Sequence, residues 1–187
     1  VMGGGSSING MMANRGAPAD YDEWAASGAA GWEWEQVLPY FRKLEHDLDF
    51  SGDQHGAGGP IAIRRIPESD WPGFSKAAAE ALANAGYRRL DDQNTSEFVP
   101  GYFPIAINNA GDRRVSTAAG YLDTEVRARP NLVILADTDV VRLLTDGARV
   151  IGVEVRDADG DVRQIAAGEV IVAAGAIHTP ALLLKSG

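Results

Sequence analysis

Apolar residues recur at helical spacing in several segments of the chain. A stripe at intervals of three and four runs through residues 33–48 and predicts an amphipathic helix. Pro39 would mark the start of this helix, because proline is tolerated in a first turn and not later. Ser75 as a cap, a run of strong helix formers and Gly86 as a stop predict a helix at 75–85. Shorter helices are expected at residues 20–24 and 116–127.

Short runs of β-branched residues dominate the chain from Asn131 onward. Runs at 132–135, 140–144, 150–155 and 162–166 are separated by turn sequences such as Asp-Gly, which predicts a β-meander. The continuous apolar run at 169–173 is typical of a strand buried on both faces. A final helix follows, with Thr179 as N-cap and Pro180 at its first position. Earlier strands are expected at 61–65 and 102–108, with a turn at 109–111 and a loop over residues 1–10.

Composition and charge narrow the class of protein. The chain has 187 residues, of which 45% are apolar and 23% charged, so it can bury a sizeable core of about one domain or slightly more. A net charge of −9 disfavours nucleic acid as a partner, since phosphate binding needs a basic face. There is no cysteine and no apolar run long enough to span a membrane. No targeting segment is visible, and we expect a cytoplasmic protein.

Glycine is over-represented, and two glycine-bearing segments could carry chemistry. There are 22 glycines, about 12% of the chain against roughly 7% in average usage. The loop Gly3–Gly10 lets bare backbone N–H groups approach a ligand and adds two hydroxyls, although a flexible turn is the alternative. Ala173-Ala174-Gly175-Ala176 follows the predicted buried strand, where α/β sheets bind ligands, although an ordinary tight connection is equally possible.

Several other reaction types lack their motifs. The first loop does not complete the dinucleotide fingerprint G-x-G-x-x-G, because Ile8 stands at its last position. The chain contains no P-loop lysine, no G-x-S-x-G nucleophile elbow and no H-E-x-x-H pair. Hydrolase and metalloprotease chemistry is therefore disfavoured, and the two glycine-bearing segments are the remaining candidates.

Together these two segments resemble the paired signatures of the glucose-methanol-choline (GMC) oxidoreductase family, flavoenzymes that use FAD to oxidise alcohols. The first signature is similar to Gly4-Gly5-Ser6-Ser7-Ile8-Asn9-Gly10, and the second to the stretch from Gly175 to Gly187. Motifs between them recur in the family's order: Asp20-Tyr21-Asp22-Glu23-Trp24, Gly31-Trp32, Leu38-Pro39-Tyr40-Phe41, His55-Gly56, Arg114-x-Ser116, Tyr121-Leu122 and Arg129-Pro130-Asn131-Leu132. The sequences of these motifs look most similar to those of family members that resemble choline dehydrogenase and hydroxymethylfurfural or aryl-alcohol oxidase.

The resemblance implies a fold class of α/β plus α+β, with part of a Rossmann-like FAD-binding domain, a β-meander and part of a substrate-binding domain. It assigns residues 1–60 to the FAD-binding loop and following helices, and residues 61–130 to part of the substrate-binding domain. Residues 131–187, with the β-meander, a strand and a helix, belong again to the FAD-binding domain. In the family an N-terminal unit holds the ADP part of FAD and a C-terminal segment supplies a catalytic histidine. We therefore expect missing N- and C-terminal parts of the same polypeptide and no catalytic residue in this chain.

By similarity, Val1 and the loop at 3–7 lie along the flavin and its pyrophosphate. Asn9, Gly10 and Met12 approach the isoalloxazine and ribityl side. Val140 matches a valine whose backbone contacts the adenine, and Ala174-Gly175 matches the stretch near the adenosine. Ile8 stands where some members have a histidine bonded to FAD, and its side chain has no nucleophilic nitrogen. The cofactor is therefore expected to be noncovalent FAD. The residues expected to bind it are Val1, Gly3, Gly4, Gly5, Ser6, Ser7, Asn9, Gly10, Met12, Val140, Ala174 and Gly175.

The function that the resemblance implies is oxidation of a small-molecule alcohol by hydride transfer to flavin N5, with the base outside this chain. Two alternatives remain open: an FAD-containing hydroxynitrile lyase of the same family, and a non-catalytic flavin-binding or scaffold protein. For other conspicuous side chains we expect structural roles. The tryptophans at 24, 32 and 34 are expected to pack, and the arginine pairs at 64–65 and 113–114 are expected to carry surface or inter-domain charge.

Overall fold

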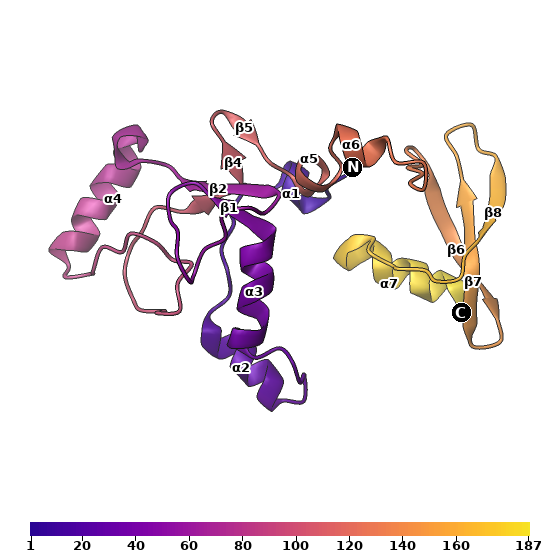
Figure 1. Cartoon of the computed structure of the whole chain (residues 1–187), viewed down its shortest axis with the longest axis horizontal. Coiled ribbons are helices and arrows are strands. Elements are labelled where there is room, and N and C mark those ends of the chain that lie inside the picture. The colour runs from indigo at the N-terminus through magenta and orange to yellow at the C-terminus, as the bar shows by residue number, and fades with distance from the viewer. The chain divides into compact units, whose positions relative to one another are not determined.

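The computed structural model describes all 187 residues, and its internal contacts divide the chain into two compact units (Figure 1). Unit 1 comprises Val1–Arg127 and unit 2 comprises Ala128–Gly187. Helices and short strands occur in both units, which confirms the mixed α/β character expected from the sequence. The assignment of the three ranges to cofactor and substrate domains stays a prediction.

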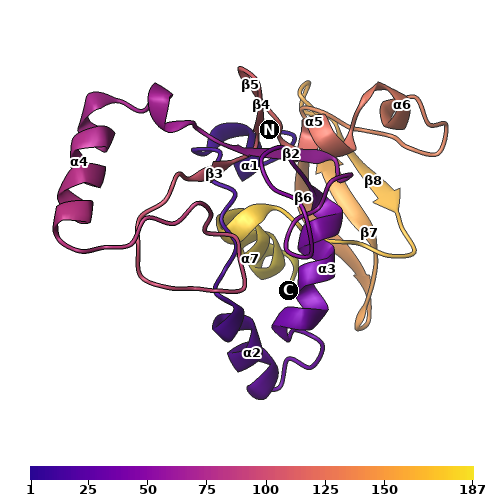
Figure 2. The ribbon, with the colours of Figure 1, turned by 60° about the vertical axis from the view of Figure 1, so that its left-hand side comes forward.

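Unit 1 is built on a three-stranded sheet of order β1-β2-β3, in which β1 is parallel to β2 and β3 is antiparallel to it. Figures 1 and 2 both show α4 standing apart from α2 and α3. The elements of the unit are α1 (Gly5–Ile8), α2 (Pro18–Ala26), α3 (Trp34–Leu44), β1 (Glu45–Asp47), β2 (Ile61–Arg65), the 3-10 turn η1 (Glu68–Asp70), α4 (Gly73–Asn84), β3 (Ala106–Ile107), β4 (Asn109–Ala110), β5 (Arg113–Arg114), α5 (Thr117–Tyr121) and α6 (Thr124–Arg127).

The core of unit 1 lies on one face of this sheet. Ile61, Ile63 and Ala106 are buried together, and Leu44 and Val115 pack against them. The alternation of β2, with every second side chain buried, follows the two-residue period of a strand. The sheet therefore places the end of α3 and the segment after β3 close to each other.

The structure corrects several predicted bounds in unit 1. Residues 5–8 form a helical turn within the expected loop, and only 106–107 of the expected strand 102–108 is a strand. Helix α3 begins before Pro39, because the Trp34 N–H donates to Asp22 Oδ1 at 2.9 Å and fixes the first turn. It ends at Leu44 because the next three residues pair with β2 instead. Helix α4 begins at Gly73, so Ser75 is not its cap.

The expected helix at 116–127 is divided in two. Ser116 caps α5 as the sequence indicates, since its Oγ accepts from the Ala119 N–H at 3.2 Å. The backbone leaves helical geometry at Leu122. Asp123 Oδ1 then accepts from the Val126 N–H at 2.8 Å and supports the start of α6. A second capping side chain inside the predicted helix accounts for the break.

Unit 2 contains the predicted β-meander. Strands β6 (Asp139–Asp146), β7 (Arg149–Arg156) and β8 (Val162–Ala166) form an antiparallel sheet in sequence order. Helix α7 (Gly175–Ser186) packs against β6, and Ser186 Oγ accepts from the Leu143 N–H at 2.9 Å. Buried Leu143, Val155 and Leu182 form the core between sheet and helix.

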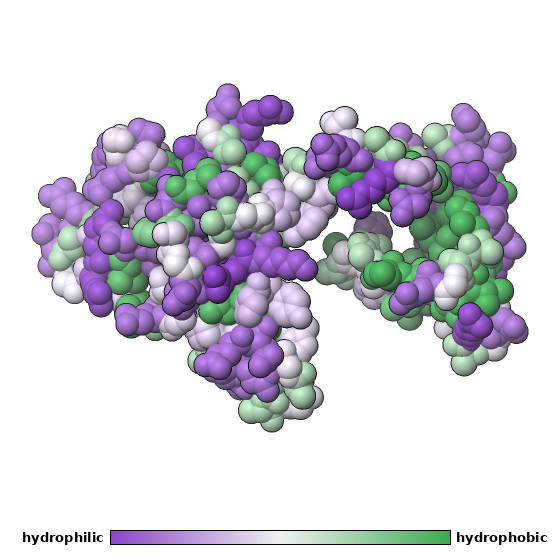
Figure 3. Space-filling view, in the orientation of Figure 1, coloured by the Kyte–Doolittle hydropathy of each residue, from purple (hydrophilic) through white to green (hydrophobic).

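Two of the predicted strands in unit 2 are absent. Residues 132–135 and 169–173 have no strand partner, and Val133 and Ile171 are 77% and 84% exposed. A β-branched run becomes a strand only when another strand takes its backbone hydrogen bonds, and neither run pairs with one in this chain. Figure 3 shows hydrophobic residues at the surface of the sheet and helix of this unit. None of the helices is long and apolar enough to cross a membrane.

Helix α7 also begins earlier than its sequence predicts. It starts at Gly175, whose φ is +88°, and Pro180 lies inside the helix rather than at its first position. Thr179 is therefore not the N-cap. Its Oγ1 nevertheless accepts from the Ala174 N–H at 3.0 Å, so the threonine stabilises the first turn from inside the helix.

Candidate functional site

A pocket with a volume of about 490 Å³ opens beside the glycine-rich loop of unit 1. The core residues Ile61 and Ile63 form part of its lining, so the pocket lies against strand β2 of the sheet. Buried Arg15 also lines it. Five of the residues expected to bind the cofactor are brought together here: Gly5, Ser6, Asn9, Gly10 and Met12.

Hydrogen bonds inside the loop determine its shape. Ser7 Oγ donates to the Met2 carbonyl at 2.7 Å, and Ser6 Oγ donates to the Gly3 carbonyl. Both hydroxyl protons are thus used within the loop, so each serine meets an additional ligand mainly as an acceptor. Gly3 has a φ of +83°, and a Cβ there would crowd Ser7 Oγ and Ala118. The loop therefore requires glycine at this position.

The backbone at the pocket is open enough to accept a cofactor. A Cβ added at Gly10 would meet no atom within 4 Å, so the bare backbone borders free space inside the pocket lining. Met11, the next residue, has a φ of +63°, which a non-glycine residue rarely adopts and which is concentrated at functional sites. Its carbonyl accepts from the Asn108 N–H at 2.9 Å, which holds this conformation. The loop fits the close approach of a planar ring.

The other predicted residues at the start of the chain lie outside this pocket. Val1 is 88% exposed, and Gly3, Gly4 and Ser7 are not part of the lining. Three residues that the sequence did not single out for binding, Asn108, Val115 and Thr117, do line it. They come from the segment around β4, β5 and α5, about 100 residues along the chain. The motif Arg114-x-Ser116 was the one sequence signal for this segment.

Unit 2 has a pocket of its own, with a volume of about 420 Å³. Val140 from β6 and Ala174 from the turn before α7 both line it, so two predicted residues distant in sequence meet at one site. Exposed His178 lies beside them in the lining. Gly175 is not in the lining, although its positive φ allows the turn that precedes α7. Cofactor contacts at these positions stay predictions.

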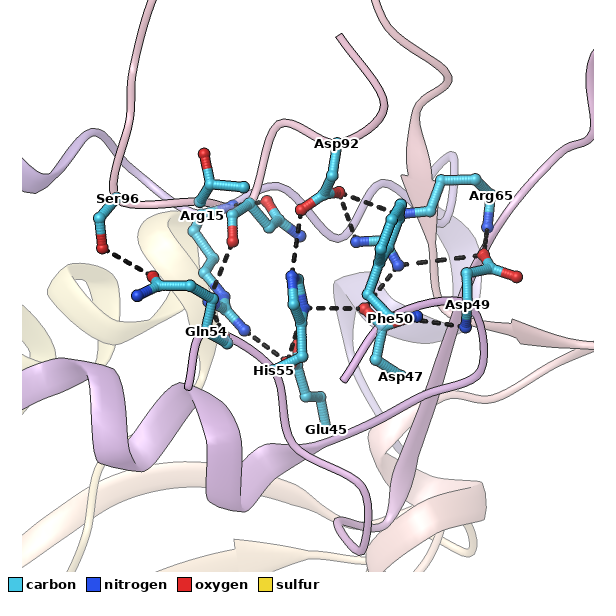
Figure 4. Close-up of polar contacts among 12 residues, drawn as sticks. Arg15, Glu45, Asp47, Asp49, Phe50, Gln54, His55, Arg65, Asp92 and Ser96 are labelled. Carbon is cyan, nitrogen blue, oxygen red and sulfur yellow. Dashed lines mark hydrogen bonds and ion pairs between the residues drawn. The ribbon is translucent and has the colours of Figure 1, made fainter. Parts of the chain in front are cut away.

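A cluster of buried charges joins five segments of unit 1 (Figure 4). The His55 imidazole lies in its centre, with Nδ1 3.0 Å from Asp47 Oδ2 and Nε2 3.3 Å from Asp92 Oδ2. Arg65 donates to the same two carboxylates, and Arg15 donates to Glu45. The cluster therefore connects β1, the end of β2, the β1–β2 loop, the segment after α4 and the segment between α1 and α2.

Burial and charge shift the pKa values in this cluster. The carboxylates of Asp47, Asp92 and Glu45, which lie within 3.4 Å of the imidazole nitrogens, raise the pKa of His55 to about 10, so the imidazole is doubly protonated at neutral pH. Burial by itself would raise the pKa values of Asp47 and Asp92, but their ion pairs with His55 and Arg65 outweigh it and lower both. Three carboxylates thus face three cations at neutral pH.

This charge balance argues against a metal ion at the cluster. Glu45, Asp47 and His55 are residue types that bind metals, and their ligand atoms lie within 4.8 Å of one another. Arg65 and Arg15 already donate to the two carboxylates, however, and a metal-bound histidine must be deprotonated. A divalent cation would have to displace guanidinium groups from buried oxygens. We interpret the cluster as an internal support.

The expected surface position of Arg65 is therefore wrong, since its side chain is 5% exposed and forms ion pairs with Asp47 and Asp92. The expectation for the tryptophans is confirmed for Trp34, which is buried, whereas Trp24 and Trp32 are about half exposed. The sequence did not predict the cluster, and of its residues only His55 stands in a motif, His55-Gly56, that carries the family resemblance. A Cβ at Gly56 would overlap the Arg42 carbonyl oxygen, so the glycine lets the His55 loop lie against the end of α3.

Comparison with known proteins identifies the class of protein. The chain is 48% identical over its whole length to "5-(hydroxymethyl)furfural oxidase" from a Methylovorus strain, and 40% identical to "Oxygen-dependent choline dehydrogenase" from Ectopseudomonas mendocina. It spans 35% and 33% of these two proteins. The crystal structure of pyridoxine 4-oxidase from "Mesorbium loti" matches 97% of this chain and 35% of its own, with a TM-score of 0.90 and 35% identity. The fold is thus that of an oxidoreductase.

The family model described as GMC oxidoreductase matches residues 1–187. The chain belongs to the GMC oxidoreductase family, which confirms the resemblance read from its two signatures. It spans about a third of the length of the relatives reported above.

Proposed function

We propose that the full-length protein containing this chain is an FAD-dependent oxidoreductase that oxidises a small-molecule alcohol. The observation that carries the proposal is the pocket of unit 1, because the first family signature and the adjacent Met12 line it with bare backbone and five expected cofactor residues. The family match over the whole chain supports the same cofactor. When bound, FAD supplies a hydride acceptor at flavin N5, and the base that takes the hydroxyl proton would lie outside this chain.

The residues of this chain bind and shape rather than react. Gly10 would allow close approach of the ring system, since nothing fills the space beside its Cα. Ile63 and the apolar floor of the pocket would exclude water from one side of it. Val140 and Ala174 would border the adenosine part in the pocket of unit 2. None of these groups can exchange a proton with the alcohol, which agrees with a catalytic base elsewhere.

We propose a primary alcohol on a small aromatic ring as the substrate class. Two similar proteins are named for 5-(hydroxymethyl)furfural and for pyridoxine, and both molecules carry a hydroxymethyl group on a heteroaromatic ring. The third is named for choline, a primary alcohol without a ring. The identity of 48% to the furfural oxidase, against 40% to the choline enzyme, favours the aromatic alcohol.

The proposal includes noncovalent attachment of the cofactor. Ile8 is 69% exposed at the loop position where some family members have a bonded histidine, and its side chain offers no nucleophile. The affinity must then come from noncovalent contacts, to which this chain would contribute those of the loop.

The test is to express the full-length protein and assay 5-(hydroxymethyl)furfural, pyridoxine and choline for aldehyde formation and oxygen consumption. We expect a yellow protein that oxidises the heteroaromatic alcohols faster than choline. Cleavage of a cyanohydrin without oxygen consumption would instead indicate the hydroxynitrile lyase. A protein that binds FAD but neither oxidises an alcohol nor cleaves a cyanohydrin would be a flavin-binding scaffold.

A further inference from the structure

We propose that Arg114 and Thr117 are positioning residues that hold the cofactor loop, residues 3–10, in its binding conformation. The inference rests on the proposed function and extends it, because it assigns cofactor retention partly to a segment more than 100 residues away in sequence. These two residues belong to β5 and α5, and we refer to their bonds to the loop as the loop tether.

The loop tether consists of four contacts, three of which end on Ser6, while in the fourth the Thr117 hydroxyl donates to the Gly3 carbonyl at 3.3 Å. Arg114 Nη1 donates to the Ser6 carbonyl at 3.0 Å. The Thr117 backbone N–H donates to Ser6 Oγ at 2.9 Å, and the Thr117 hydroxyl lies 3.0 Å from the same oxygen. Because Ser6 Oγ also donates to the Gly3 carbonyl, the tether and the turn of the loop share one hydroxyl. A shift of α5 would therefore move the loop.

Arg114 has no competing partner in this chain. No carboxylate lies within ion-pair distance of its guanidinium, and its one side-chain hydrogen bond is the bond to Ser6. Its neighbour Arg113 is exposed and its side chain makes no hydrogen bond or ion pair. The two consecutive arginines therefore differ in function: Arg114 is half-buried against the loop, whereas Arg113 points to solvent. An arginine that bonds a single backbone carbonyl is suited to fixing a loop rather than to balancing charge.

The tether holds the part of the pocket lining of unit 1 that would contact the cofactor. Ser6 and Thr117 both line the pocket of unit 1. Helix α5 also approaches the loop closely, since a Cβ at Gly3 would lie 3.1 Å from the Ala118 side chain. Loss of the tether would let residues 3–10 sample other conformations, and the cofactor would then have to order them on binding. That ordering cost appears as weaker affinity.

The test compares four variants of the full-length protein, each titrated with FAD after removal of the bound flavin. Arg114→Met removes the bond to the Ser6 carbonyl, Arg114→Lys retains a cationic donor, and Thr117→Val removes the hydroxyl while retaining the backbone N–H. Arg113→Met is the matched control. We expect the Kd for FAD to rise about tenfold in Arg114→Met and about threefold in Thr117→Val, to recover partly in Arg114→Lys, and to stay unchanged in Arg113→Met.

A second measurement separates positioning from a general loss of structure. The visible circular dichroism of the bound flavin reports its surroundings, and we expect it to change in Arg114→Met and Thr117→Val at saturating FAD but not in Arg113→Met. Wild-type affinity and spectrum in both tether variants would overturn the proposal. Weak binding in Arg114→Met beside wild-type behaviour in Thr117→Val would also overturn it, because it would mean that the guanidinium contacts the cofactor itself. If Arg114→Met does not fold, Thr117→Val and Arg114→Lys decide the question by the same criteria.

Failure of the proposed function has a different signature. In that case the wild-type protein would either bind no FAD or bind FAD without oxidising an alcohol. If only the present inference fails, the wild-type protein still binds FAD, and the tether variants bind FAD with the same Kd as Arg113→Met.

Discussion

Replacement of His55 tests the physical account of unit 1 most severely, because this side chain lies between three carboxylates. His55→Gln keeps a polar side chain of similar reach but removes the positive charge. Asp47 and Asp92 would then face Arg65 alone, and Glu45 would face Arg15 alone. Breaking one partner out of a buried charge cluster costs about 3–5 kcal/mol in other proteins, because it leaves a buried charge uncompensated.

The raised pKa of His55 gives an independent magnitude and a pH dependence. Each pKa unit corresponds to about 1.36 kcal/mol. A rise in the pKa of His55 from 6.5 to about 10 therefore means that protonation of His55 stabilises the folded state by about 5 kcal/mol. Because the folded pKa lies above the unfolded value, this stabilisation is complete below pH 6.5 and is lost as pH rises through 10. At pH 8, two units below the folded pKa, about 3 kcal/mol remains by the same conversion.

Hydrogen exchange of the peptides that cover residues 45–65 measures the opening of this region in the full-length protein. His46→Gln is the matched control, since His46 lies on the same strand with an exposed side chain. Comparing the variants at one pH cancels the pH dependence of chemical exchange. We expect His55→Gln to lower protection strongly at pH 6 and progressively less toward pH 10. A His55→Gln variant that exchanges like His46→Gln at pH 6, or a deficit independent of pH, would refute the reasoning.

Three further predictions concern glycines and the cofactor. Gly56→Ala places a methyl group on the Arg42 carbonyl and should cost more than about 3 kcal/mol of stability, whereas Gly58→Ala, which meets no atom, should leave the melting temperature unchanged. Gly10→Val should fold normally, because its Cβ enters open space, but should weaken FAD binding measured by fluorescence titration; unchanged affinity would mean that the cofactor does not approach Gly10. Acid precipitation of the holoenzyme should release the yellow colour into the supernatant, and colour retained in the pellet would disprove noncovalent attachment.

Local sequence signals predicted the elements that depend on local interactions. The period-two pattern of β2, the meander β6-β7-β8 and the Ser116 cap all agree with the structure, because each follows from neighbours in the chain. The errors arose where distant residues decide. Helix α3 stops at Leu44 because β2 pairs with the next residues, and it starts at Trp34 because Asp22 accepts from the Trp34 N–H. Neither partner can be identified from the helix itself.

In the candidate site, too, local sequence signals predicted some features, and contacts between distant residues were missed. The glycine signatures located two segments that line pockets, and the family match confirms the signatures. Sequence reasoning could not find the buried charge cluster, since arginine and aspartate are usually exposed and only the fold brings Arg65 to Asp92. It likewise classed Arg114 with surface charge, although its bond to Ser6 crosses 108 positions. The expected strands at 132–135 and 169–173 failed because a strand needs a partner that this chain does not supply.

The most direct test of the central claim is anaerobic mixing of the full-length protein with an aromatic primary alcohol while flavin absorbance is recorded. The account predicts a protein that carries FAD and loses its yellow absorbance as the alcohol is oxidised. A protein that binds FAD but keeps its absorbance with each of the heteroaromatic alcohols and with choline, or one that binds no FAD, would contradict it.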